Sequence, residues 1–366
     1  SYDATVNIYD GAEIYQNGTT SYNGCLVGVS GNGTVNVYGG YGKGVSGGFI
    51  AMTSGGTINV AGGEWIANTD GTYANDNNSV LIAQSADGAS SIVNVTGGIF
   101  RGGYNCYGAA VGDAQINIRG GNFNADPSAY CAAGYIAKDN GNGTFSVVED
   151  QVAKIGDETY KFLHEAFDAA QDGDEIVVLK DIVLTEGITV AADDNMTLDL
   201  NGKTISMQDA SNNSAYAIKN NGRLTIKDSD EGGKGGKITF NSTTPDNSFG
   251  YATSTIGNGG HLTIENGLIE NTTVGGASYA VDGIWHTGEA SLTINGGTMV
   301  AKKVAVRQVP FSATAKNTVT INGGTFTGET AGLQMFNINN DAKLSETIIK
   351  GGTFNGTYAF YTSFTS

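Results

Sequence analysis

A short alternation of apolar and polar residues recurs along the whole chain. Its full form is an apolar residue, Asn or Thr, a second apolar residue, one variable residue, a Gly-Gly pair, and a large apolar residue two positions after the pair. Full copies occupy 58–65, 93–100, 116–123, 292–299 and 319–326, and shorter copies occupy 6–8, 35–40, 262–264 and 349–354. Side chains of a β-strand point alternately to its two faces, so this pattern predicts strands with one apolar face.

The glycine pairs set the length of the repeating unit. They begin at positions 39, 62, 97 and 120 in the first half, and at 296, 323 and 351 in the second half. A repeat of roughly 20 to 40 residues is typical of a solenoid, in which each repeat adds one coil to a stack. We therefore predict an all-β solenoid, with glycine at the corners where the chain turns with positive φ.

The pattern changes near residue 150. Before it the copies carry Asn between their apolar residues, and after it they carry Thr. Residues 161–170 have apolar side chains at helical spacing, and the polar segment 171–174 ends the expected helix. We predict two stacked segments, 1–150 and 151–366, and we expect the second to be opened by a capping helix near 161–170.

The passage from about residue 153 to 205 carries a recognisable combination of elements. The short amphipathic segment 163–170 is followed by Asp-Gly-Asp-Glu-Ile-Val-Val at 172–178. This resembles the start of pectin-lyase-like domains, and also modules of large secreted or wall-attached proteins of Gram-positive bacteria. In such domains this helix and turn cover the first coil of a right-handed parallel β-helix. The resemblance implies that fold and an extracellular or cell-surface location.

Charge narrows the expected partners. The chain has 36 Asp and Glu against 19 Lys and Arg, a net charge of −17. Nucleic acids and anionic lipid surfaces both attract basic proteins, so neither is an expected partner. No apolar run is long enough to cross a membrane.

The three cysteines, Cys25, Cys106 and Cys131, cannot all pair within the chain. No Cys-x-x-Cys spacing indicates a metal site. We predict buried thiols, with a Cys106–Cys131 disulfide as the alternative, since these two residues are about one coil apart.

Stacked coils, about 4.8 Å apart, would align equivalent polar residues in columns. The predicted ladder residues, with Asn7 at the start of the first column, are Asn36, Asn59, Asn94 and Asn117, and then Thr225, Thr263, Thr293 and Thr320. The favoured interpretation is that they stiffen the stack, as identical stacked side chains do in cross-β arrays. The alternative is a flat face matched to a polymeric ligand such as a polysaccharide or ice. The doubled Thr-x-Thr rows expected of an ice face are absent.

Aromatic residues suggest both packing and binding. The phenylalanines that follow glycine pairs, Phe100, Phe123, Phe326 and Phe354, are expected to stack in the core. Tyrosines in turns or at outward positions, among them Tyr9, Tyr38 and Tyr41, suit contact with sugars or proteins, because tyrosine gives contact area at small entropic cost.

One column of the second half could carry chemistry. The repeat register aligns Lys219, Ser254, Asp282 and Arg307, with Asp282 beside Arg307. Pectate-lyase-type enzymes use an external groove with acidic calcium ligands and an arginine, and this resemblance implies catalytic candidates. They are Asp282, His286 and Arg307, with Trp285, Tyr279 and Tyr251 as carbohydrate contacts. The alternative is an exposed cross-coil ion pair, which would contribute well under about 1 kcal/mol.

The densest acidic cluster is Asp228, Asp230 and Glu231. Calcium takes six or more oxygen ligands, and this loop offers three carboxylates and its carbonyls. Lys234 and Lys237 follow closely, so a solvated turn is the favoured interpretation and calcium the alternative. No other cofactor is expected.

These observations favour a non-enzymatic structural or adhesive module of an extracellular bacterial protein or filament. It would act as a stalk or bind glycans or partner proteins. The alternative is a polysaccharide lyase or glycoside hydrolase with an external groove; a phage tail-spike is weakened by the internal cap and the lack of a trimerisation segment. Both ends of the sequence lie in coil phase without a visible cap, so we expect further coils or end-to-end self-association there.

Overall fold

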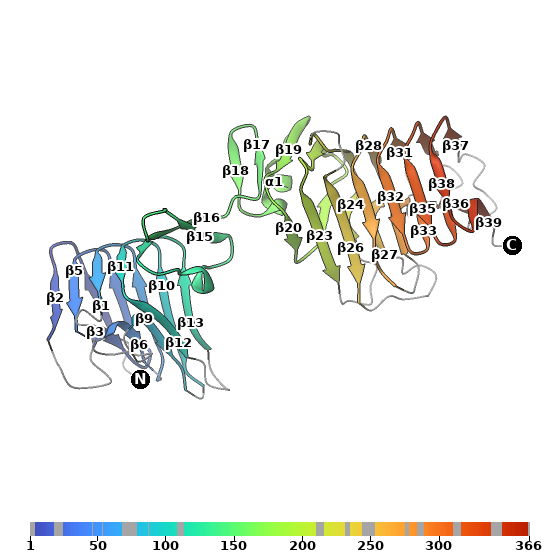
Figure 1. Ribbon diagram of the computed structural model, residues 1–366. Coiled ribbons are helices and arrows are strands. Elements are labelled where there is room, and N and C mark those ends of the chain that lie inside the picture. Colours follow the sequence, from blue (N-terminus) through green and yellow to red (C-terminus); the bar gives the residue numbers. More distant parts are fainter. Residues whose placement is uncertain are drawn as a thin grey trace. The chain divides into compact units, whose positions relative to one another are not determined.

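The computed structural model forms two compact units, unit 1 (Ser1–Asp150) and unit 2 (Gln151–Ser366) (Figure 1). The structure describes residues 4–17, 25–45, 47–52, 54–67, 79–86, 88–107, 113–209, 216–230, 235–243, 253–274, 278–283, 289–309, 316–337 and 346–364. Most of these residues lie in β-strands. Among them the only helices are α1 (Leu163–Ala169) and the 3-10 helix η1 (Ser128–Tyr130). The all-β class is therefore observed.

In unit 1 the chain passes through three sheets in turn, and we call one such passage a rung. Sheet A contains β1 (Thr5–Ile8), β4 (Thr34–Val37), β7 (Gly56–Val60), β10 (Ser90–Val95) and β13 (Asp113–Ile118). Sheet B contains β2 (Glu13–Gln16), β5 (Tyr41–Gly44), β8 (Glu64–Ile66), β11 (Ile99–Arg101), β14 (Asn122–Phe123), β16 (Phe145–Glu149) and β15 (Tyr135–Asp139). Sheet C contains β3 (Cys25–Val29), β6 (Gly47–Ala51), β9 (Ser79–Gln84) and β12 (Gly103–Tyr107).

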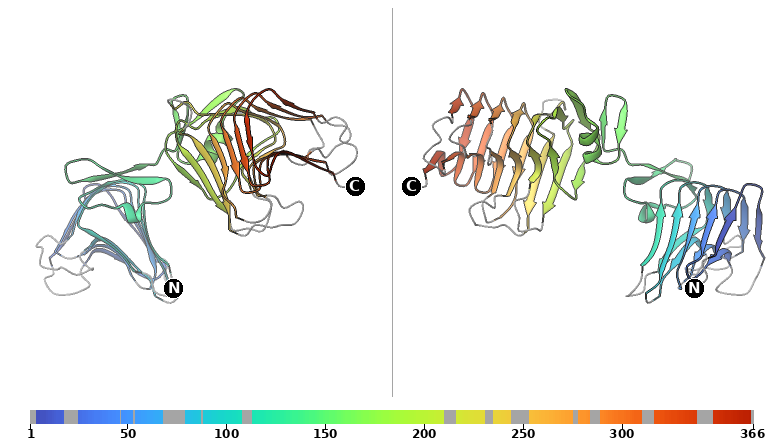
Figure 2. Two further views of the ribbon diagram at one scale, coloured as in Figure 1. Left: turned by 45° about the vertical axis from the view of Figure 1, so that its right-hand side comes forward. Right: turned by 180° about the vertical axis from the view of Figure 1, so that it is seen from behind.

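Unit 2 repeats this plan with three sheets of nine, seven and seven strands (Figure 2). Sheet E contains β18 (Glu158–Tyr160), β17 (Ala153–Ile155), β19 (Asp174–Val178), β22 (Asn195–Asp199), β25 (Arg223–Lys227), β28 (His261–Ile264), β31 (Ala290–Ile294), β34 (Asn317–Ile321) and β37 (Glu346–Ile349). Sheet F contains β20 (Ile182–Leu184), β23 (Thr204–Asp209), β26 (Lys237–Ser242), β29 (Leu268–Asn271), β32 (Thr298–Ala301), β35 (Thr325–Gly328) and β38 (Thr353–Asn355). Sheet G contains β21 (Ile188–Val190), β24 (Tyr216–Asn220), β27 (Thr253–Asn258), β30 (Ser278–Gly283), β33 (Val304–Gln308), β36 (Ala331–Asn337) and β39 (Tyr358–Phe364).

The apolar residues of the repeat fill one main core in each unit, as the alternation predicts, and Tyr279, Val304 and Ala331 form a separate small cluster in unit 2. Phe100 and Phe123 stack with ring centroids 5.0 Å apart, and Phe326 and Phe354 stack at 4.6 Å. The predicted phenylalanine stacks are thus confirmed. Fully burying one such side chain stabilises the fold by about 1.5–3 kcal/mol, so each added rung strengthens the core.

The two glycines of a pair serve different purposes. A Cβ on Gly97 would lie 2.4 Å from the Ala61 carbonyl oxygen, so the first glycine lets one corner pack against the next. Gly98 has φ of 110°, a conformation that other residues rarely adopt. The pair is therefore required both by the turn and by the stacking of turns.

Both units carry antiparallel hairpins at one end of a sheet. In unit 2, β17 and β18 pair with each other, and β17 continues sheet E against β19. Helix α1 packs on β17, β18 and β21, burying Leu163, Ala166 and Phe167. In unit 1, β15 and β16 close sheet B in the same way against β14. The repeat pattern predicts neither hairpin, because the strands of both lack the glycine-pair phrase.

Sheet G corrects one predicted column. Ser254 pairs with Tyr216 and Tyr279, and Gly257 holds the register position beside Asp282. The Ser254 hydroxyl still reaches Asp282, donating to Oδ2 at 3.4 Å. The reason is that Ile256 fills the core position between its neighbours in sheet G. An alignment on the nearest tyrosine places this strand three residues out of register.

Cys25 and Cys131 are free thiols, so the Cys106–Cys131 disulfide alternative is not formed. Both are half-buried and not buried as predicted. Burial raises the pKa of both thiols. The side chain of Cys106 lies outside the described part of the structure. Within that part, no helix is long and apolar enough to span a membrane.

Candidate functional site

The predicted asparagine ladder is present on the outer face of sheet A. Each Nδ2 donates a hydrogen bond to Oδ1 of the asparagine one rung earlier, at 2.9–3.1 Å. The ladder consists of Asn7, Asn36, Asn59, Asn94 and Asn117. Every inner amide therefore uses one N–H hydrogen and its oxygen within the column.

The predicted threonine column is also in register, on the outer face of sheet E. Its predicted members are Thr225, Thr263, Thr293 and Thr320, and the structure adds Thr197 at the start of the column. All are half-buried. In the described residues no hydrogen bond joins their hydroxyl groups, so this column packs without forming a ladder.

A second amide network, inside unit 2, was missed by sequence reasoning. Asn220 Nδ2 donates to Asn258 Oδ1 at 2.8 Å, and Asn258 Nδ2 donates to the Ser291 carbonyl at 3.0 Å. Both asparagines are buried where sheet G turns into sheet E. The available signal was an asparagine followed within two residues by glycine at the end of each strand, at 220–222 and 258–259.

The structure places Asp282 beside Arg307, in register on β30 and β33. Arg307 Nε donates to Asp282 Oδ1 at 2.8 Å, while Nη2 donates to Oδ2. Nη1 donates to the Tyr279 hydroxyl at 3.0 Å, and Cζ lies 3.9 Å from the centre of the Tyr279 ring. The guanidinium group is thus held by a bidentate ion pair and by an aromatic face.

This cluster is buried, which corrects the expectation of an exposed pair. Asp282 is 0% exposed and Arg307 is 8% exposed. Burial works against the charge on Arg307, and the Asp282 carboxylate more than offsets it, so the pKa of the guanidinium group is raised. Burial also raises the pKa of Tyr279 to about 12. Arg307 therefore stays protonated, and its guanidinium group is bound by Asp282 and Tyr279.

The remaining candidates of the predicted groove do not assemble there. Tyr279 is 3% exposed and packs against Arg307, so it offers no surface to a sugar. His286, Trp285 and Tyr251 lie outside the described residues. The buried, mutually satisfied Asp282–Arg307 pair makes a poor proton acceptor, and no external groove is formed by the described members of this set.

The acidic cluster is only partly the solvated turn that was predicted, because Asp230 is exposed while Asp228 is buried and holds the turn together. The Asp228 carboxylate is buried and accepts hydrogen bonds from the Gly202 and Gly236 amides, both at 2.7 Å. Asp230 lies against Gly202, and Glu231 is outside the described residues. In the described part of the chain, no group of three His, Cys, Asp or Glu side chains is placed to hold a metal ion.

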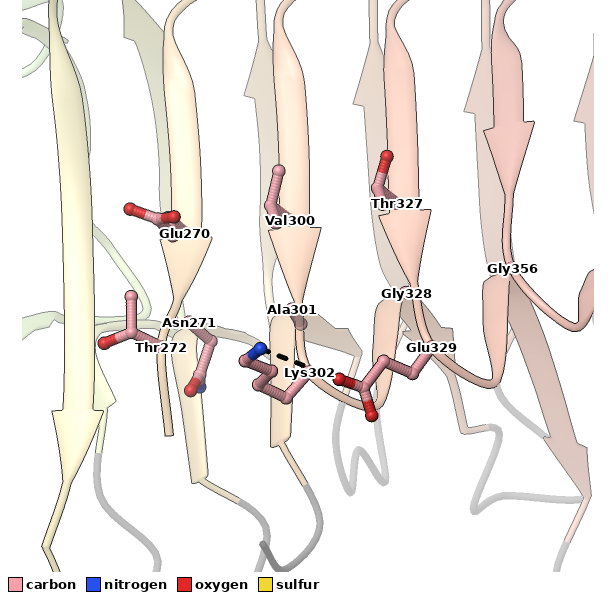
Figure 3. Close-up of a pocket in the computed structure, with 10 residues that line it drawn as sticks. All are labelled: Glu270, Asn271, Thr272, Val300, Ala301, Lys302, Thr327, Gly328, Glu329 and Gly356. Atoms are coloured by element: carbon pink, nitrogen blue, oxygen red, sulfur yellow. Dashed lines mark ion pairs between the residues drawn. The ribbon is translucent and has the colours of Figure 1, made fainter. Parts of the chain in front are cut away.

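A shallow pocket lies on the outer face of sheet F, with a volume of about 310 Å³ (Figure 3). Its lining consists of Glu270, Asn271, Thr272, Val300, Ala301, Lys302, Thr327, Gly328, Glu329 and Gly356. Glu270, Val300 and Thr327 form one column across β29, β32 and β35. Lys302 Nζ lies 3.6 Å from Glu329 Oε1 in an exposed ion pair. Sequence reasoning missed this pocket because none of its residues forms a motif.

The pocket offers hydroxyl and carboxylate groups over a small apolar floor. Glu270 and Glu329 belong to rungs two apart, so roughly 10 Å separates them along the stack. Among its ten lining residues there is no histidine, arginine or aromatic ring. Such a surface can hydrogen-bond to a sugar, and it has few groups for chemistry on one.

Comparison with protein-family models, curated proteins and solved structures finds no match to this chain.

Proposed function

We propose that both units are right-handed parallel β-helices of the pectin-lyase-like kind. The support is that the chain visits three sheets in turn, that successive rungs pair in parallel, and that one core lies between the sheets of each unit. Helix α1 and the Asp-Gly-Asp turn after it stand where the resemblance expects a cover for the first coil.

We further propose that the chain is a non-enzymatic structural and adhesive module of an extracellular bacterial protein. The observation that carries this proposal is how the polar columns are satisfied. The asparagine ladder binds to itself, and Arg307 is bound by Asp282 and Tyr279, so these side chains hold rungs together. The module would space other domains or bind glycans or proteins along its side.

An assay for lyase products tests this function directly. The full chain is incubated with pectin, alginate and glycosaminoglycans, and unsaturated uronate is followed by ultraviolet absorbance. The proposal expects no product, with or without added calcium. Product formation that disappears in Arg307→Lys, a variant that keeps the positive charge, would establish the lyase alternative instead.

A glycoside hydrolase is the second candidate, favoured by the two carboxylates of the sheet F pocket. Inverting hydrolases place their carboxyl groups about 6.5–9.5 Å apart. Here two rung spacings give about 10 Å along the stack, and Glu329 also lies two residues beyond Thr327, the residue in the Glu270 column, so the two backbone positions are farther apart than that range. Release of reducing sugar from neutral polysaccharides, abolished in both Glu270→Gln and Glu329→Gln, would support it. Release unaffected by either substitution would remove the pocket from consideration.

A further inference from the structure

Three adjacent columns on the outer face of sheet A carry a single charged residue, although the chain as a whole has a net charge of −17. One column beside the asparagine ladder runs from Thr5 to Gln115, and the column on the other side runs from Tyr9 to Arg119. Arg119 is the only charged residue of these three columns. A polyanion is repelled by the rest of the chain, so the face suits an uncharged ligand.

Two exposed tyrosines begin the column that ends at Arg119. Tyr9 and Tyr38 are 60% and 52% exposed, and their rings stack 5.1 Å apart at an angle of 14°. The centroid distance is close to the rung spacing, so the rings lie face to face along the column. Tyr38 therefore turns its second face toward the next rung.

The next rung places only a methyl group opposite that ring face. Ala61 follows Tyr38 in the column, since its amide donates to the Val37 carbonyl at 2.7 Å. Thr96 occupies the rung after it. Tyr38 and Thr96 are thus two rungs, or roughly 10 Å, apart in this column, and we call the position between them, which carries only the Ala61 methyl group, the slot.

Polar groups flank this slot on the side of the ladder. Asn59 and Asn94 lie two residues before Ala61 and Thr96 on their strands, and both are half-buried. In the described part of the chain, the ladder uses one N–H hydrogen of each amide. The other hydrogen remains for a ligand hydroxyl or carbonyl.

We propose that this slot binds a pyranose ring of an uncharged polysaccharide. The apolar face of the sugar stacks on Tyr38 above Ala61 and continues the tyrosine stack, and its hydroxyl groups bond to the Asn59 and Asn94 amides. The inference rests on the proposed adhesive function and names the face and ligand class that would serve it.

The test is depletion of the full chain from solution by insoluble cellulose, chitin and mannan, with soluble polygalacturonate as an acidic competitor. Tyr38→Ala removes the platform, and Ala61→Tyr fills the slot while extending the tyrosine stack. We expect about tenfold weaker binding for each, as truncating or blocking one aromatic anchor commonly costs. Tyr358→Ala, which removes an exposed tyrosine of unit 2, is the matched control and should bind normally.

Ala61→Tyr separates binding from folding. Because it lengthens an existing stack, it should unfold no more easily than the parent chain, so weak binding cannot be ascribed to damage. Binding of Ala61→Tyr at the parent affinity, binding of the parent to none of the three polymers, or displacement by polygalacturonate would each overturn the inference. Reducing sugar and unsaturated products are measured in the same tubes; their absence leaves the scaffold proposal standing even if binding fails.

Discussion

The two units differ in how they bury their hydrogen-bonded amides: unit 1 links five asparagines on the outer face of sheet A, whereas unit 2 links an exposed pair, Asn295 and Asn322, and a fully buried pair. In unit 1 the asparagine ladder lies on the outer face, where its first residue, Asn7, is exposed and the others are half-buried. In unit 2 the corresponding outer column is threonine without mutual hydrogen bonds, and the buried pair of linked amides is Asn220 and Asn258. Unit 2 also buries the ion pair of Asp282 and Arg307.

This difference decides what each network contributes. An amide near the surface that loses its partner can bond to water, so breaking one bond of the outer ladder should cost little stability. A buried amide or charge that loses its partner has nothing to replace it, so the inner networks fix the register strictly. Unit 1 should therefore tolerate polar substitutions that unit 2 does not.

The largest expected effect is at the buried ion pair. Arg307→Ala leaves the Asp282 carboxylate buried without its cation, which should destabilise unit 2 by about 3–5 kcal/mol. Hydrogen exchange of the β30 and β33 amides in the full chain measures this locally. The double variant Asp282→Leu with Arg307→Met should recover most of the loss, and a single variant within about 1 kcal/mol of the parent would refute the argument.

A pH dependence should follow from Tyr279 in the same cluster. Its pKa is raised from 10.0 to about 12, because burial favours the neutral phenol. The stabilisation is complete below pH 10 and is lost as the pH rises through about 12, a total of about 3 kcal/mol. Urea denaturation between pH 9 and 12 should show this slope for unit 2.

Substitution of the tyrosine provides the control for that slope. Tyr279→Phe cannot ionise and should flatten it, whereas Tyr9→Phe in unit 1 should leave it unchanged. An unaltered slope in Tyr279→Phe would assign the alkaline transition to another group.

A smaller effect is expected at the inner amides. Asn258→Ala removes one bond to Asn220 and one to the Ser291 carbonyl in a buried site, which should cost about 1–3 kcal/mol. The midpoint of urea unfolding, followed by hydrogen exchange in β27, measures it. Asn258→Asp keeps the shape and tests whether the amide hydrogens matter; stability equal to the parent would contradict the role given to them.

The smallest effects compare the two outer columns. Asn59→Ala breaks two ladder bonds and Asn117→Ala breaks one, so their costs should differ by about a factor of two, each near 1 kcal/mol or less. Thr263→Ala should cost only about 0.2–0.5 kcal/mol, since its column has no hydrogen bond to lose. Equal costs at Asn59 and Thr263 would remove the distinction between a ladder and a packed column.

Much of the fold could be predicted from the residue pattern, because aligning the repeats with one another also gives the register in which their strands pair. Asn36, Asn59 and Asn94 align in the sequence and therefore in space, and Gly97 and Gly98 mark a corner that no other residue pair allows. The reading failed where a strand departs from the pattern. Ser254 was misplaced because the strands were aligned on their tyrosines. In this strand Ser254 itself pairs with Tyr216, and Ile256 pairs with Ile218.

The candidate site was harder to predict, because the alignment of repeats shows which residues are neighbours and does not show whether their side chains are buried. Asp282 and Arg307 were correctly placed side by side, but sequence alone gave no sign that Tyr279 would pack on them and exclude solvent. The pocket at Glu270 and Glu329 joins residues of separate rungs whose spacing varies with loop length. Only the folded stack brings them together.

The asparagine ladder also has a direction. Each amide from Asn36 onward donates toward the lower-numbered rung, so the side-chain dipoles point the same way and add along the stack. Rotating one inner amide by half a turn would set oxygen against oxygen on one side and hydrogen against hydrogen on the other. The orientations are thus coupled, and reversal requires all five asparagines to turn together. A column of small, separately flexible side chains in this way behaves as a single two-state element.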